Sequence, residues 1–181
     1  LESLDLSRSF AEVRFDSVEL PASALVGPAG GAADLVARQL AVAGALTVAE
    51  TVGTMDREFA ITLEYAKHRI AFGRPIGSFQ AIKHLLADTS LDLEMSKAIA
   101  LAAARTVGAD EGYGAEAASM AKAFVGDCSI TFGQSCFQVF GGIGYTWEHD
   151  QHLYLRRLTT DASLFGDPAW HREHLCQLAG L

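Results

Sequence analysis

The residues best suited to chemistry lie in a short loop near the middle of the sequence. Arg69 stands at the end of a predicted helix, Phe72 follows in the loop, and Gln80 comes soon after in the next helix. An arginine can pair with a pyrophosphate through two parallel hydrogen bonds, a ring can cover an adenine, and an amide can bond a ribose or base edge. The group therefore suits a dinucleotide. A helix hairpin with an ordinary turn has the same composition, so a structural role also fits.

A second group ends a later helix in three glycines. Gln138 lies in the last turn of that predicted helix, and Gly141, Gly142 and Gly144 follow it. Because glycine lacks a Cβ, a ligand or another backbone can approach closely there. Glycines also simply end helices. Taken alone, the cluster indicates either a ligand contact or a helix stop.

The histidines give no convincing metal site. His149 and His152 are three residues apart on a predicted helix, but no third ligand is evident. We interpret them as part of a solvated face, and His171 and His174 in the same way. No bound metal is expected.

Helices must position both groups, and the sequence predicts several. Residues 32–69 contain no proline and few glycines, and their apolar side chains recur at three and four spacing, as in a long helix. A second helix is expected from an N-cap at Ser78 to about Val107. After a turn over residues 108–114, further helices are expected over 115–140, 147–164 and 168–179.

The start of the chain has a different pattern. Apolar and charged residues alternate over residues 9–20, which predicts one or two half-buried strands. Pro21 and the glycine-rich segment 27–31 then break the backbone. The sequence thus predicts an all-α fold, an antiparallel helical bundle with a short β lead-in, divided into residues 1–27 and residues 28–181.

Composition limits the partners and the compartment. Half of the 181 residues are hydrophobic, which is enough for one core. A net charge of −8 without a basic run argues against nucleic acid. No apolar run reaches the roughly 20 residues of a membrane helix, because Glu50, Arg57 and Lys67 interrupt the alanine-rich segments.

The three cysteines lack C-x-x-C spacing, which indicates buried thiols in a reducing, cytoplasmic compartment. The first residues lack the order of a signal peptide, and we expect the chain to be part of a larger protein or a trimmed product.

Together the two groups resemble a known family. Residues 68–76 read His-Arg-Ile-Ala-Phe-Gly-Arg-Pro-Ile, and residues 138–146 read Gln-Val-Phe-Gly-Gly-Ile-Gly-Tyr-Thr. These stretches match the R-x-x-F-G-x-P-I and Q-x-x-G-G-x-G-Y-T-x-E signatures of acyl-CoA dehydrogenases, and the resemblance covers the whole chain. With residues 153–157, the second stretch is most similar to actinobacterial members, several of which act on steroid side-chain or other bulky CoA thioesters.

The resemblance implies a flavin site shared between subunits. The implied partner is a homologous acyl-CoA dehydrogenase subunit, in a hetero-oligomer or in a homodimer or tetramer, and the implied substrate is an acyl-CoA. In the family, the pyrophosphate and adenosine half of an FAD held mainly by the neighbouring subunit would be gripped by Arg69, Phe72, Gln80, Gln138, Gly141 and Gly142.

The family's catalytic carboxylate is missing from both of its usual positions. An acyl-CoA dehydrogenase removes the substrate α-proton with a Glu while the β-hydride goes to the flavin. One position, in a turn after the glycine motif, holds Gly166, and the other, on the first long helix, holds Ala43. Gly44 stands where many members have an Arg, and Pro168 replaces a flavin-contacting Thr. The resemblance therefore implies a non-catalytic subunit that completes the FAD site of a partner carrying the Glu.

Two alternatives remain open. Asp167 is the nearest acid to the expected position and would be the base of a self-sufficient dehydrogenase, although capping the helix that begins at Pro168 is the commoner use of such an Asp. Glu50 lies two helical turns from Ala43, too far to substitute. The other alternative is a flavin-free helical interaction module. The small residues at 41 and 43–45 are expected to let helices pack closely rather than to enlarge an acyl pocket.

Overall fold

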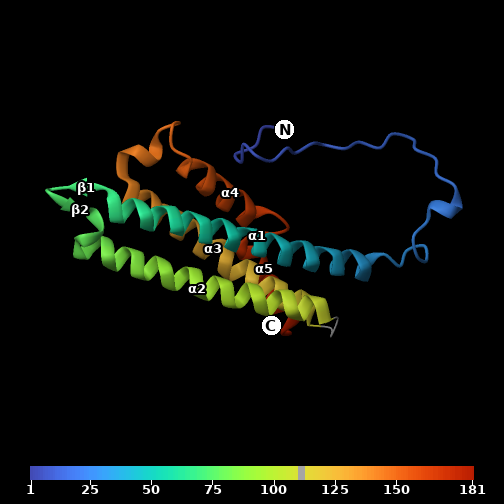
Figure 1. Cartoon of the computed structure of the whole chain (residues 1–181). Coiled ribbons are helices and arrows are strands. Elements are labelled where there is room, and N and C mark those ends of the chain that lie inside the picture. The colour runs from blue at the N-terminus through green and yellow to red at the C-terminus, as the bar shows by residue number, and fades with distance from the viewer. Residues whose placement is uncertain (110–112) are drawn as a thin grey trace.

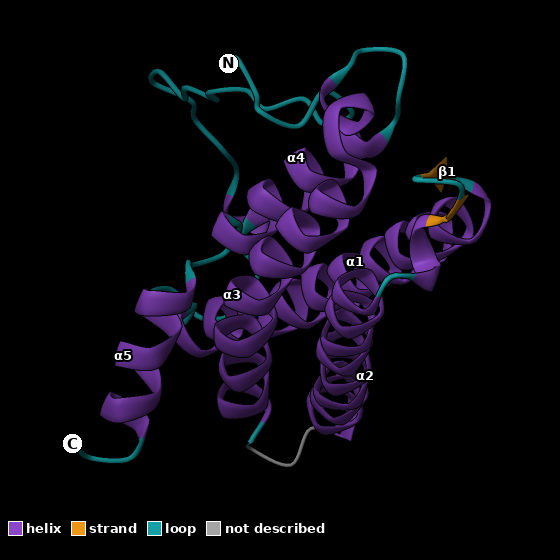
Figure 2. Ribbon diagram, turned by 90° about the vertical axis from the view of Figure 1, so that its left-hand side faces the viewer, coloured by secondary structure: helices purple, strands orange, loops and turns teal. Residues whose placement is uncertain are grey.

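In the computed structural model, which describes residues 1–109 and 113–181, three long helices lie side by side. Helix α1 (Ala33–His68) is followed by the antiparallel α2 (Gln80–Ala109), and α3 (Gly114–Phe140) packs against both (Figure 1). Two shorter helices, α4 (Gln151–Ser163) and α5 (Pro168–Leu178), pack against α3 (Figure 2). The predicted all-α bundle is confirmed.

Most helix ends lie within a few residues of their expected places. The turn predicted over residues 108–114 lies partly outside the described residues, and the described Gly108, Ala109 and Gly114 are helical. Ser78 was the wrong N-cap. It ends the short 3-10 helix η2 (Ile76–Ser78), and its buried Oγ has no hydrogen-bond partner. Helix α2 begins two residues later because the Phe79 carbonyl accepts from the Lys83 N–H, at 3.0 Å.

The predicted strands over residues 9–20 are wrong. This segment has no strand assignment, and its apolar side chains at Val13, Phe15 and Val18 are exposed. A strand needs a neighbour that pairs with its backbone groups, and no other described segment lies beside it (Figure 1). A short 3-10 helix, η1 (Ala22–Ala24), follows. Residues 9–20 therefore have the alternating pattern of a strand but no paired strand beside them.

Ion pairs anchor the first eight residues to α4, and the segment that follows is not anchored in this way. Asp5 is buried, and its carboxylate is paired with Arg157 of α4, with Nε and Oδ2 2.5 Å apart. The Arg8 guanidinium lies 2.9 Å from Oδ1 of the buried Asp161. These ion pairs hold the N-terminal end against α4, so the chain loops away and returns to α1 (Figure 1).

The hydrophobic core lies where α1, α2, α3 and α4 meet. Among the described cysteines, Cys136 belongs to the core, Cys128 is half-buried and Cys176 is exposed, so the expectation of buried thiols is wrong for Cys176. The buried cluster consists of Val48, Met55, Leu93, Ala100, Ala103, Ala121, Val125, Phe132, Cys136 and Leu158.

Helix α1 is more apolar than the sequence reading allowed. By length and composition it could cross a membrane, so the expectation that no stretch reaches that length is wrong. One such helix is weak evidence for a span, because the core helix of a soluble protein passes the same test. Helix α1 contacts α2, α3 and α4, and 33% of its most apolar window is buried.

Candidate functional site

A two-stranded hairpin presents the first predicted group at one end of the bundle. Strands β1 (Ile70–Ala71) and β2 (Arg74–Pro75) pair antiparallel directly after α1. The Ile76 N–H donates to the Arg69 carbonyl at 2.8 Å, and the Arg69 N–H donates to the Tyr65 carbonyl at 2.8 Å. The hairpin is thus fixed to the last turn of α1.

The two residues at the hairpin tip both have positive φ. Phe72 has φ 53° and Gly73 has φ 78°, which is the backbone of a type I′ turn. Glycine adopts this region freely, whereas a phenylalanine there is strained. The Phe72 side chain is 95% exposed. The turn therefore holds a ring in solvent, where packing gains almost nothing from it.

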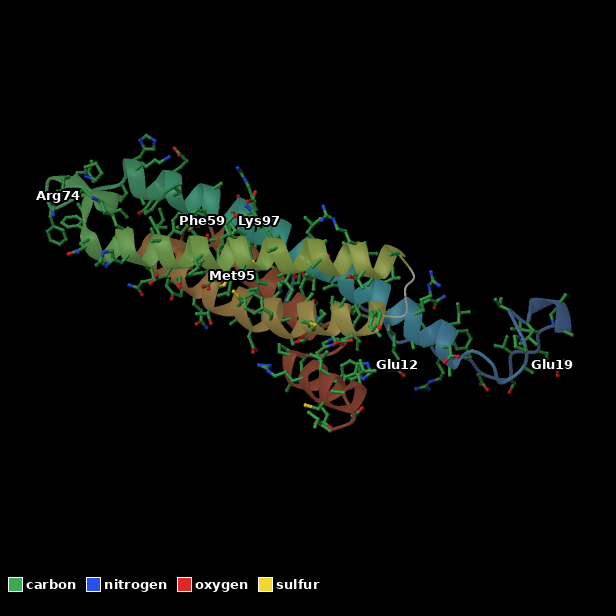
Figure 3. All side chains as sticks on the ribbon, turned by 90° about the horizontal axis from the view of Figure 1, so that it is seen from below. Glu12, Glu19, Phe59, Arg74, Met95 and Lys97 are labelled. Carbon is green, nitrogen blue, oxygen red and sulfur yellow. The ribbon has the colours of Figure 1, made fainter. Side chains whose placement is uncertain are left out.

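Two guanidinium groups and two rings gather on this hairpin. Arg74 lies over the Phe79 ring, 4.2 Å from its centroid, and the Phe72 ring meets Phe79 edge-on at 6.1 Å. Figure 3 shows Arg74 at this end of the bundle. The exposed Arg69 guanidinium makes no hydrogen bond or ion pair within the described residues. Arg74 is not among the residues predicted to contact the cofactor, although its position between Phe72 and Phe79 in the sequence indicates it.

The second predicted group lies at the end of α3. Gln138 is exposed on the last turn, and Gly141 ends the helix with φ 62° and ψ −141°, which a residue with a Cβ adopts only with strain. The 3-10 helix η3 (Gly141–Tyr145) follows. A Cβ added at Gly141 or Gly142 would have no other atom within 4 Å. Open space therefore faces both glycines.

Packing brings the two groups to the same end of the molecule. The Tyr65 ring on α1 and the Phe140 ring on α3 lie 4.7 Å apart, centroid to centroid. A small buried cluster joins Ala66, Leu86 and Val139 from three helices. Arg69 follows Tyr65 by four residues, and Gly141 follows Phe140 directly. The end of α1, the start of α2 and the end of α3 thus form one exposed surface, which we call the hairpin end.

The hairpin end has the chemistry that a dinucleotide needs. Arg69 offers a free guanidinium, Phe72 an exposed ring, and Gly141 and Gly142 an unobstructed backbone. Gln80 is exposed, and its amide Nε2 lies 3.5 Å from His84 Nε2. All six residues predicted to contact the cofactor lie at the hairpin end. Their outward exposure suits a ligand that a second molecule holds from the other side.

The turn between α4 and α5 leaves no space for a side chain at position 166. Gly166 has φ 105°, and a Cβ there would lie 2.7 Å from Trp170 Cε3 and 2.9 Å from His171 Nε2. Both distances are shorter than any normal carbon contact. A residue with a side chain at position 166 therefore needs this turn to move.

Asp167 caps α5. Its Oδ1 accepts a hydrogen bond from the Trp170 N–H at 2.8 Å, and Pro168 occupies the first helical position. The structural use expected for such an Asp is confirmed.

His171 was wrongly assigned to a solvated face. It is only 5% exposed, and its Nδ1 lies 3.1 Å from Ser119 Oγ on α3. Burial lowers its pKa to about 4, and the nearby Lys122 ammonium acts in the same direction. The imidazole is therefore neutral at pH 7. His174, by contrast, is only partly buried and stacks on Trp170 at 5.0 Å.

A cavity of about 250 Å³ lies between α1, α3 and this turn. Ala41 and Gly44 line it from α1, and Phe165 and His171 line it from the other side. Gly44 is buried at the contact between α1 and α3, as close packing predicts, and Ala41 and Gly44 also line this cavity. A Cβ at Gly44 would meet Lys122 Cγ at 3.6 Å, an ordinary contact, so a methyl group fits there.

Three further buried ionisable groups were missed. Burial lowers the pKa of Lys122 to about 8, and its Nζ donates to the Asp161 carbonyl at 2.7 Å. Burial raises the pKa of Asp161 to about 6, against the pull of Arg8. Burial raises the pKa of Glu58 to about 8. Glu58 falls on the buried stripe with Met55 and Thr62, and this spacing was the signal for it.

No group of three or more His, Cys, Asp or Glu side chains in the described ranges could hold a metal ion.

Residues 31–177 match the family described as acyl-CoA dehydrogenase, C-terminal domain. The chain belongs to the acyl-CoA dehydrogenase family. It is 41% identical over 128 residues to acyl-CoA dehydrogenase IpdE2 of Mycobacterium tuberculosis, covering 70% of this chain and 38% of that protein. It is 33% identical over 177 residues to acyl-CoA dehydrogenase IpdE2 of Mycolicibacterium smegmatis, covering 97% of this chain and 50% of that protein.

A solved acyl-CoA dehydrogenase structure has the same helical arrangement. A variant of the Tcur3481-Tcur3483 steroid ACAD matches with a TM-score of 0.76 at 27% identity, covering 83% of this chain and 41% of that chain. The chain spans half or less of the length of these relatives. The resemblance predicted from the two motifs is confirmed, and it identifies the chain with the helical domain of a family of flavoprotein oxidoreductases.

Proposed function

We propose that this chain is the non-catalytic part of a heteromeric acyl-CoA dehydrogenase and that it completes the FAD site of a partner subunit. One observation carries the proposal. The hairpin end presents a free guanidinium, an exposed ring and open glycines, whereas position 166, where the family resemblance expects a base, has neither a carboxylate nor room for one.

At the hairpin end, each residue has a role that its geometry supports. Arg69 would pair with the pyrophosphate, Phe72 would cover the adenine, and Gln80 and Gln138 would bond the ribose or base edge. Gly141 and Gly142 would let the cofactor approach the backbone. When bound, FAD supplies the acceptor for the β-hydride in α,β-desaturation of an acyl-CoA.

The two positions where the family resemblance expects the base support the same division of roles. Gly166 and Ala43 carry no carboxylate, and the Asp167 carboxylate is committed to the first turn of α5. The His171 imidazole lies under Gly166, but its Nε2 is shielded from solvent. We infer that the partner supplies the base and binds the acyl-CoA. The Tcur3481-Tcur3483 neighbour, whose name joins two gene products, supports such an assembly.

The test is co-expression of this chain with an acyl-CoA dehydrogenase subunit that carries the catalytic Glu. We expect a complex that retains flavin absorbance, and the chain alone to be colourless and inactive. Arg69→Ala should release flavin, while Arg105→Ala should not. Arg105 is also exposed, has no partner among the described residues, and lies near the opposite end of α2, so it is a matched control.

Two outcomes would overturn the proposal. Flavin-dependent turnover by this chain alone would favour a self-sufficient dehydrogenase, and Asp167→Asn would then test Asp167 as its base. A stable complex that never retains flavin would favour a helical interaction module. Each outcome selects one of the three functions.

A further inference from the structure

A buried carboxyl and a buried amide meet beneath the glycine loop. Glu58 of α1 and Gln151, the first residue of α4, are both 0% exposed. The Gln151 Nε2 donates a hydrogen bond to the Glu58 Oε1. This contact joins the centre of α1 to the point where the chain re-enters the bundle after η3.

The other oxygen of Glu58 and the amide oxygen of Gln151 are best explained by a protonated Glu58. Glu58 Oε2 and Gln151 Oε1 are both buried without a hydrogen-bond partner. Two carboxylate or carbonyl oxygens cannot bond to each other unless one carries a proton. A protonated carboxyl donates its O–H to the amide carbonyl while it accepts from the amide N–H. Protonation of Glu58 therefore supplies the one hydrogen that these two acceptor oxygens lack between them.

The surroundings favour the same state. Among the described residues, the Cys136 thiol of α3 is the titratable group that faces the carboxyl, and burial and Glu58 together raise the pKa of this thiol. His149 lies on the far side of the pair, where its Nδ1 accepts from the Gln151 N–H at 3.1 Å. No cation among the described residues affects the pKa of Glu58, which burial raises to about 8.

The pair also supports the glycine loop. A Cβ added at Gly144 would lie 3.7 Å from Gln151 Cγ and 3.1 Å from Phe140 Cβ. Gly144 is therefore buried directly against the Gln151 side chain. Because Gln151 is held by Glu58, the position of η3, which begins with Gly141 and Gly142, depends on a contact deep in the core.

We propose that Glu58, held protonated, is a positioning residue that fixes η3 through Gln151 for the flavin contact. Opening of the loop brings Glu58 into water, where it loses its proton. The proposal rests on the flavin role of η3 proposed above, but its test needs no flavin.

The experiment is amide hydrogen exchange of residues 142–146 in the whole chain between pH 5 and 9, corrected for intrinsic exchange rates. The open state releases the Glu58 proton near the ordinary value for Glu, and the closed state near pH 8. Loop opening should therefore increase about tenfold per pH unit between these values and then level off. Carbon-13 labelling of Glu side chains should show one carboxyl that titrates near pH 8.

Two variants provide the controls. Glu58→Gln keeps a neutral group of the same size, so the loop should stay protected, the pH dependence should vanish, and the high-titrating carboxyl signal should disappear. Glu64→Gln removes an exposed carboxylate on the same helix, paired with Lys67, and should leave the slope unchanged.

Three results would overturn the proposal. The first is a loop whose protection has the same pH dependence in Glu58→Gln. The second is the absence of any carboxyl that titrates above pH 6. The third is an equal slope at Leu93 in the core of α2, which would mean that Glu58 acts on global stability alone. If loop opening shows the expected pH dependence but the chain never gains flavin with a partner, the loop mechanism stands and only the proposed function is rejected.

Discussion

The hairpin end and the α4–α5 turn differ in the space around their glycines and in the groups that they leave free. At the hairpin end, Phe72 and Arg69 are exposed and a Cβ at Gly142 would meet nothing. At the α4–α5 turn, His171 is buried and neutral, and a Cβ at Gly166 would collide with two aromatic rings. The hairpin end leaves binding groups free in open space, whereas at the α4–α5 turn two rings occupy the space beside position 166.

This difference shows how two parts of one site can separate. A cofactor contact requires groups that stay free in the isolated chain, and such groups persist at the hairpin end at some cost in strain. A proton-abstracting carboxylate requires a side chain and space around it, and the α4–α5 turn has filled that space with Trp170 and His171. The two regions are therefore expected to respond oppositely to substitution.

The largest contrast is expected between Gly166→Ala and Gly142→Ala. The first adds a methyl group 2.7 Å from Trp170 Cε3 at a positive φ, so it should lower the free energy of unfolding by about 3 kcal/mol. The second adds a methyl group to open space and should change this free energy by less than about 0.5 kcal/mol. Urea denaturation of the two variants checks both values. Equal free energies of unfolding for the two variants would show that position 166 has space for a side chain.

The next contrast concerns pH. The folded pKa of His171, about 4, lies below its ordinary value of 6.5, so the unfolded chain takes up the proton first. The stabilising contribution of neutral His171 is complete above about pH 6.5 and is lost as the pH falls toward 4, by about 3 kcal/mol. The wild type should therefore lose more stability than His171→Gln over this range. Unfolding curves at several pH values measure the difference, and parallel pH profiles would rule out a buried neutral imidazole.

The smallest expected effect is at Phe72. Its positive φ costs about 1 kcal/mol, and its exposed ring gains little from packing. Phe72→Gly should therefore raise the free energy of unfolding by about 1 kcal/mol and, in the complex with a partner, weaken flavin retention. Thermal denaturation and flavin absorbance give the two readings. A loss of stability would mean that the ring supports the fold.

The helices could be predicted because their signals are local. Apolar spacing and the Gly141 stop place α1 and α3 nearly as observed, and the two motifs identify the residues of the hairpin end. The strands over residues 9–20 could not be predicted correctly, because a strand depends on a neighbour that the local pattern does not reveal. Ser78 failed as a cap because it ends η2 and its Oγ is buried away from the first turn of α2.

The polar interior was the hardest part to predict. His171, Lys122 and Glu58 look like surface residues by type, and only contacts between distant helices make them buried. Spacing on the buried stripe of α1 would have indicated Glu58, but no local signal reveals that Gln151 is its partner. The cavity beside Gly44 also depends on how three elements pack.

The most direct measurement is the flavin content and acyl-CoA turnover of the complex with a Glu-bearing partner, compared between Arg69→Ala and Asp167→Asn in this chain. Asparagine caps a helix as well as aspartate does, so the second change preserves α5. We predict that Arg69→Ala loses flavin and turnover together, through a charge-assisted contact whose loss weakens binding about tenfold or more, while Asp167→Asn keeps both. A flavin-containing Asp167→Asn complex without turnover would contradict the account.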